Sequence, residues 1–96
     1  MDKESFDKIA SYIGLAQRAG AVLYGEDMIE EKLKSAKLVL VDSKAPEKYS
    51  SRVQKKSSSL PFFKLDGLRD ALHRENVNAI ALTNEHLANA IIDILR

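Results

Sequence analysis

Apolar positions along the chain alternate between helical spacing and short continuous runs. Near the N-terminus, Phe6, Ile9 and Ile13 recur every three or four positions, which indicates the buried face of a helix. Gly20 follows this pattern and is a suitable C-terminal cap. Residues 37–42 instead contain the unbroken run Leu-Val-Leu-Val, which is typical of a strand covered on both faces.

The rest of the chain repeats this alternation. Strands are expected at residues 21–24, 37–41, 60–65 and 78–83. Further helices are expected at 26–35, from Pro46 to about 58, at 67–74, and after Asn84, which is a good N-cap. This order predicts an α/β fold, a three-layer α-β-α sandwich with a central four-stranded mixed sheet. The buried positions should include Ile9, Ile13, Leu33, Leu38, Leu40, Phe62, Leu72, Ile80, Leu82 and Ile91.

Length and composition indicate one domain, residues 1–96, because a second hydrophobic core could not be built from so short a chain. There is no cysteine, which excludes disulfides and thiolate metal sites. The first five residues, Met-Asp-Lys-Glu-Ser, do not resemble a signal or transit peptide, and no apolar stretch is long enough to span a membrane. These features predict a soluble cytoplasmic protein with no membrane partner.

The sequence offers little material for catalysis. His73 and His86 are predicted on separate helices and do not have a zinc-binding spacing. The four glycines lie far apart and form no phosphate-binding loop. No nucleophile–base pair can be assembled. We therefore expect a protein that is not an enzyme and that uses no cofactor, metal or small-molecule substrate.

Positive charge is concentrated in the middle of the chain, although the formal net charge is only +1. Residues 37–56 contain six basic and two acidic residues. Within them, Lys48, Arg52 and Lys56 fall at intervals of four on the predicted third helix, and Lys55 lies beside them. This basic stripe could follow an RNA backbone, or it could be an ordinary solvated helix face.

Acidic residues crowd the start of the predicted second helix, where Glu26, Asp27, Glu30 and Glu31 follow Gly25. Carboxylates in a first turn stabilise the helix dipole by about 0.3–1 kcal/mol each, and this needs no ligand. The same residues could form a surface that faces another protein. A loose divalent-metal site is a third interpretation, although no calcium-binding spacing is present.

Several segments together resemble one protein family. They are 13–20 (IGLAQRAG), 25–27 (GED), 36–41 (AKLVLV), 60–63 (LPFF), and 79–84 (AIALTN) leading into 88–91 (ANAI). In this order they resemble YlxQ-like bacterial members of the kink-turn RNA-binding ribosomal-protein superfamily. The match covers almost the whole chain.

The resemblance implies a small protein of the bacterial cytoplasm that binds ribosomal or other structured RNA, with the ribosome as a candidate assembly. It implies RNA contacts from the start of the second helix and from the loop before the last strand. The corresponding residues here are Gly25, Glu26, Asp27, Met28, Glu31, Lys32, Glu75, Asn76 and Val77. Lys37 and the stripe residues Lys48, Arg52, Lys55 and Lys56 are further candidates for phosphate contacts.

This chain departs from the family motif. The motif has Asn and Glu two and three residues after the glycine and Lys six after it, whereas this chain has Asp27, Met28 and Glu31. Carboxylates oppose the approach of a polyanion. An alternative function is therefore a protein-interaction or regulatory module that keeps the fold but has lost kink-turn binding.

Overall fold

Four strands form one mixed sheet in the computed structural model, which describes residues 1–96. The strands are β1 (Val22–Tyr24), β2 (Leu38–Asp42), β3 (Phe62–Leu65) and β4 (Ala79–Leu82). Their order in the sheet is β1-β4-β2-β3. Strand β4 pairs antiparallel with both β1 and β2, while β2 and β3 are parallel. The predicted four-stranded mixed sheet is confirmed, with strand ends shifted by one or two residues.

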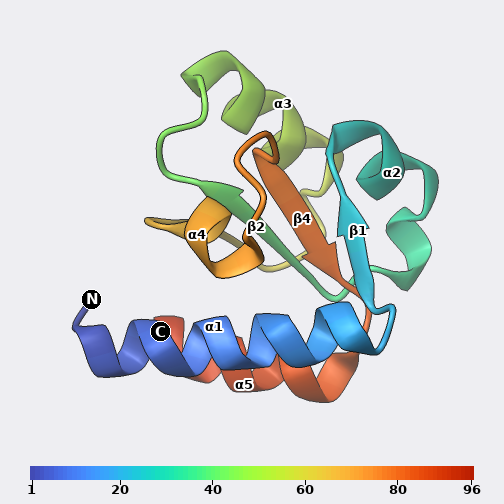
Figure 1. Ribbon diagram of the computed structural model, residues 1–96. Coiled ribbons are helices and arrows are strands. Elements are labelled where there is room, and N and C mark those ends of the chain that lie inside the picture. The colour runs from blue at the N-terminus through green and yellow to red at the C-terminus, as the bar shows by residue number, and fades with distance from the viewer.

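Helices cover both faces of the sheet, which gives three layers (Figure 1). One face is covered by α1 (Lys3–Arg18), α4 (Leu68–Leu72) and α5 (Glu85–Leu95). The other face is covered by α2 (Glu26–Glu31) and α3 (Glu47–Lys56). None of these helices has both the length and the apolar character needed to cross a bilayer.

The two central strands explain why the chain needs helices on both sides. Successive side chains of a strand point to opposite faces. Accordingly Leu38 and Leu40 of β2 join the core under α1 and α5, whereas Val39 and Val41 join the core under α2 and α3. All four side chains have no exposed surface. The interpretation of this apolar run as a doubly covered strand is therefore confirmed.

The last helix begins where the sequence predicts. The Asn84 side chain accepts a hydrogen bond from the Leu87 N–H at 2.9 Å, which satisfies one free donor of the first turn of α5. The third helix is shorter than expected, because it ends at Lys56. There the buried Ser57 hydroxyl donates to the Val53 carbonyl at 2.7 Å and takes part in closing the last turn.

Two other expectations are wrong in detail. The second helix does not continue to residue 35 but ends at Glu31, and a separate 3₁₀ turn follows over Leu33–Ser35. The tighter turn reverses the chain within a few residues, so that it can enter β2 from the far end of the sheet. Leu33 and Phe62 are only half-buried, and Phe62 lies on the edge strand β3, which has a neighbour on one side only.

Candidate nucleic-acid interface

The two predicted RNA-contact segments, about fifty residues apart in sequence, lie at the same end of the sheet. Strand β1 ends and β4 begins at this end, where Tyr24 pairs with Ile80. The Gly25 N–H donates to the Ala79 carbonyl at 2.9 Å. The antiparallel register therefore sets the start of α2 beside residues 75–78, which precede β4. We call this region the Gly25 end.

Glycine is required at the start of α2. Gly25 has φ 86° and ψ 164°, a backbone conformation that is essentially restricted to glycine. It turns the chain from β1 into α2, which Ile29 then anchors in the core with 1% of its surface exposed. The outward side of this turn carries Asp27 and Met28, and the Met28 side chain is 40% exposed.

The other segment of the Gly25 end is held from beneath by Arg69 of α4. Its guanidinium donates to the Val77 carbonyl at 3.4 Å and to the Asn78 side-chain oxygen. The buried Asp42 carboxylate, at the end of β2, accepts hydrogen bonds from the backbone N–H groups of Arg69 and Lys44 at 3.1 and 2.8 Å. The loop is thus fixed at its base, while Glu75 and Asn76 remain exposed.

Neither Arg69 nor Asp42 is among the residues predicted from the sequence to form the site. Only Asp42 could have been recognised from the sequence. It is the single acid at the end of an otherwise apolar run, and a buried carboxylate needs hydrogen-bond donors. Nothing local marks Arg69, because its partners come from a different part of the chain.

The acidic helix start and the basic stripe are partners of one another. The Glu26 carboxylate accepts hydrogen bonds from Arg52 Nε at 2.9 Å and Nη2 at 3.0 Å. Lys56 Nζ lies 3.0 Å from a Glu26 oxygen and 2.7 Å from a Glu30 oxygen. Arg52 also lies over the Tyr49 ring, 5.5 Å from its centroid. These contacts tie α2 to α3.

The ionisation of these groups follows from the contacts. The Arg52 guanidinium, and after it the Lys56 ammonium, lower the pKa of Glu26 from 4.5 to about 2. In turn, Glu26 raises the pKa of Arg52, and Glu30 followed by Glu26 raises that of Lys56. Glu26, Arg52 and Lys56 are therefore charged near neutral pH.

The sequence left three interpretations of the acidic helix start open, and the structure supplies a fourth: Glu26 and Glu30 are counter-ions for α3. No group of three or more His, Asp or Glu side chains is arranged to hold a metal ion. Of the stripe residues, Lys48 and Lys55 make no ion pair. They are the cations of α3 that a ligand would meet without displacing a carboxylate.

Two other predicted residues lie away from the Gly25 end. Lys37 precedes β2, and its N–H donates to the Leu82 carbonyl at 2.7 Å, at the opposite end of the sheet. The length of β2, about 16 Å at the usual rise per residue, separates Lys37 from the Asp42 end. Lys32 ends α2 as its C-cap residue, at the other end of the helix from Gly25, and the 3₁₀ turn that follows it leads to β2.

Arg74 is a further cation near the Gly25 end that is not among the predicted site residues. Its guanidinium lies 4.4 Å from the centroid of the Tyr24 ring, which is a favourable cation–π geometry. The Tyr24 hydroxyl accepts a hydrogen bond from Gln17 Nε2 at 3.1 Å, so the ring itself is held in place. Arg74 makes no ion pair and stands directly before the exposed Glu75 and Asn76.

Comparison with known proteins identifies a shared architecture. No protein-family model and no curated protein matches the chain. Among solved structures, it is similar to a protein of unknown function from Bacillus halodurans C, with a TM-score of 0.82 and 21% sequence identity. The similarity covers 92% of this chain and 96% of that one. The chain thus shares nearly its entire three-layer α/β fold with the Bacillus halodurans protein.

Proposed function

We propose that this chain is a non-catalytic RNA-binding protein of the bacterial cytoplasm, a YlxQ-like member of the kink-turn RNA-binding ribosomal-protein superfamily. It would bind ribosomal or kink-turn-like RNA through the Gly25 end. The observation that carries the proposal is the hydrogen bond from Gly25 to Ala79, which sets the start of α2 beside residues 75–78. The resemblance requires these two segments to act together.

The Gly25 end offers suitable contacts for structured RNA. Splayed nucleotides are recognised by hydrogen bonds to their base edges. The exposed Asn76 amide can provide such bonds, and nothing lies within 4 Å of the place of a Cβ at Gly25, so a sugar or phosphate can approach its backbone there. Lys48 and Lys55 on the adjacent α3 supply phosphate contacts.

The ion pairs between α2 and α3 make the acids more compatible with RNA. Glu26 and Glu30 are neutralised by Arg52 and Lys56, which leaves Asp27 and Glu31 as the carboxylates of α2 that make no ion pair. We expect these two to weaken discrimination between a kink-turn and other folded RNAs. Lys48 and Lys55 should then carry most of the affinity, which makes binding strongly salt-dependent.

The test is a titration of the protein against a kink-turn RNA and a hairpin of equal length at two salt concentrations. The double variant Lys48→Glu, Lys55→Glu should reduce the log–log salt slope by roughly 0.7–0.9 for each phosphate that is no longer neutralised. The matched control is Lys3→Glu with Arg96→Glu, the same charge change on the opposite helical layer, and it should leave the slope unchanged.

Specificity is tested by two further variants. Asp27→Asn with Glu31→Lys removes two carboxylates and supplies an amide and a cation, so it should raise the preference for the kink-turn. Asn76→Ala should weaken kink-turn binding on the order of tenfold, since it removes a hydrogen bond to a base edge. The proposal fails if neither RNA binds at low salt, or if binding is insensitive to both Asn76→Ala and the double lysine variant.

A specific observation favours the alternative function as a protein-interaction module. Met28 is 40% exposed at the Gly25 end beside the exposed Asp27, and a flexible methionine is a side chain that adaptable protein-binding surfaces often use. In that case Met28→Ser should abolish capture of the partner, while the lysine variant has no effect.

A further inference from the structure

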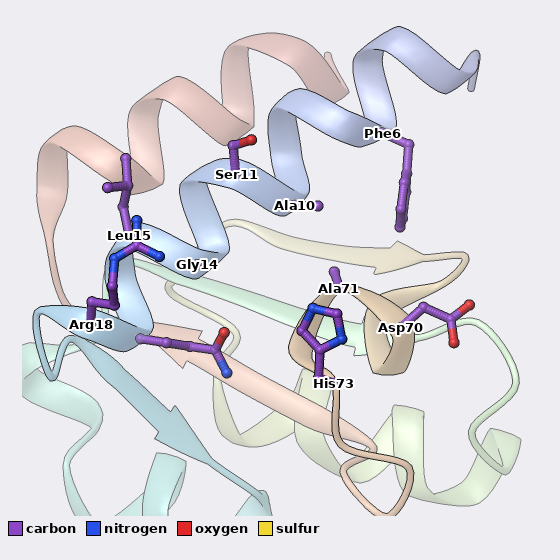
Figure 2. Close-up of a pocket in the computed structure, with 10 residues that line it drawn as sticks. Phe6, Ala10, Ser11, Gly14, Leu15, Arg18, Asp70, Ala71 and His73 are labelled. Carbon is purple, nitrogen blue, oxygen red and sulfur yellow. The ribbon is translucent and has the colours of Figure 1, made fainter.

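A groove lies between α1 and α4, on the face of the sheet opposite α2 and α3 (Figure 2). Its volume is about 710 Å³. Figure 2 shows Ala10 and Gly14 of α1 across the groove from Ala71 of α4. Because these residues are small, the two helices leave an open floor between them.

Larger side chains surround this floor. Phe6 and Asp70 lie toward one end, and Leu15 and Arg18 lie toward the other, with His73 between them (Figure 2). Leu15 is 45% exposed, which is unusual for a large apolar residue of this chain. A Cβ added at Gly14 would lie 3.8 Å from Arg18 Nη1, so the guanidinium reaches back over the glycine. Arg18 makes no ion pair.

His73 occupies its place in the groove at a conformational cost. It ends α4 with φ 57° and ψ 37°, and it is the only residue other than glycine with a positive φ. Glycine or asparagine is the usual choice for such a left-handed helix end. The structure instead carries an imidazole there, and Figure 2 shows its ring standing in the groove.

The groove is continuous with the Gly25 end through a chain of contacts. Gln17 lines the groove and donates to the Leu72 carbonyl at 3.3 Å and to the Tyr24 hydroxyl at 3.1 Å. The Arg74 guanidinium lies over the ring of the same tyrosine. Arg18 and His73 thus line the groove, and Arg74, the residue after His73, contacts Tyr24, the residue before Gly25.

We propose that this groove binds one unpaired nucleotide of the RNA held at the Gly25 end. The base lies on the floor formed by Ala10, Gly14 and Ala71, against the His73 ring. Arg18 holds its phosphate, and Arg74 holds the phosphate that leads toward Gly25. The inference rests on the proposed function and extends it to a second contact surface.

The composition of the groove favours a nucleotide over an acidic peptide. Both ligands would suit Arg18, but an acidic side chain entering the groove would meet the Asp70 carboxylate. The same carboxylate can accept a hydrogen bond from the exocyclic amino group of an adenine, cytosine or guanine. A base also uses the His73 ring for stacking, as unpaired bases commonly do on histidine and other planar side chains.

The test follows backbone amide shifts of the ¹⁵N-labelled protein on addition of adenosine monophosphate, an unstructured oligoadenylate, inorganic phosphate or an oligoglutamate. We expect the first two to shift amides of residues 10–18 and 70–74, with the oligoadenylate the tighter ligand because it can also reach Arg74. Absence of these shifts at millimolar nucleotide overturns the inference. So do shifts reproduced in full by phosphate alone, or shifts caused by oligoglutamate and not by nucleotide.

Two matched pairs of variants sharpen the test. Gly14→Leu fills the groove and should abolish the shifts, whereas Lys8→Leu, at an exposed position of the same helix outside the groove, should preserve them. His73→Gly should raise Tm because the left-handed backbone is relieved, yet weaken nucleotide binding about fivefold or more through loss of stacking. His73→Asn tolerates the same backbone and also removes the ring, so it should weaken binding similarly.

The two proposals fail separately. If the wild-type protein shows no groove shifts and kink-turn binding is unchanged in Gly14→Leu, the groove site is ruled out while the Gly25 end stays intact. If groove shifts occur but kink-turn binding is insensitive to both Asn76→Ala and the double lysine variant, the nucleotide site is kept and the proposed interface is ruled out.

Discussion

Replacing Gly25 by alanine isolates the energetic cost of one backbone conformation. Gly25 has φ 86° and ψ 164°, a region that costs an L-residue about 1–3 kcal/mol. Nothing lies within 4 Å of an added Cβ, so no steric clash contributes. Gly25→Ala should therefore lower the free energy of unfolding by about 1–3 kcal/mol, purely through backbone strain.

Gly14→Ala is the matched control with the opposite sign. Gly14 lies inside α1, where alanine is preferred over glycine by about 0.8–1.0 kcal/mol, and its added Cβ makes only an ordinary contact with Arg18. The same added methyl group should thus stabilise the protein at position 14 and destabilise it at position 25. For a domain of this size, each kcal/mol shifts Tm by roughly 4–8 °C.

Urea denaturation of both variants, followed by far-UV circular dichroism, measures the two differences directly. Equal m-values would show that the denatured state is unchanged. A Gly25→Ala variant as stable as wild type would refute the reasoning, because it would mean that the turn from β1 into α2 can adopt an ordinary backbone conformation. If Gly14→Ala also lowers the free energy of unfolding, the loss at position 14 comes from side-chain packing in the groove and not from the helix backbone.

Two further predictions concern single side chains. The folded-state pKa of Glu26 is about 2, below its ordinary 4.5, so its stabilising contribution is complete above about pH 5 and is lost as the pH falls toward 2. The difference in free energy of unfolding between wild type and Glu26→Gln should therefore shrink as the pH is lowered over that range. A difference that stays constant from pH 6 to pH 2 would contradict the ion-pair assignment. Asn84→Ala removes the cap of α5 and should cost about 0.5–2 kcal/mol in urea denaturation, whereas Asn89→Ala, an exposed position inside the same helix, should not destabilise the protein.

The sequence by itself determined the class of fold. Leu-Val-Leu-Val at 38–41 demanded cover on both faces, because every second side chain of a strand points the other way. Local chemistry also set the start of α5, since the capping bond of Asn84 joins residues only three apart. Such features depend on neighbours in the chain, and a pattern of residue types records them.

Tertiary structure decided which charges are available to a ligand. Glu26 and Arg52 are twenty-six residues apart, and only the packing of α2 beside α3 turns two separate charge patterns into one neutral cluster. The same holds for Arg74 over Tyr24, and for Arg69 beneath residues 77–78. The length of helices was also decided in space, because the chain after Glu31 had to return to the far end of the sheet. Contacts of this kind arise from the register of β1 with β4 and from helix packing, which no local spacing encodes.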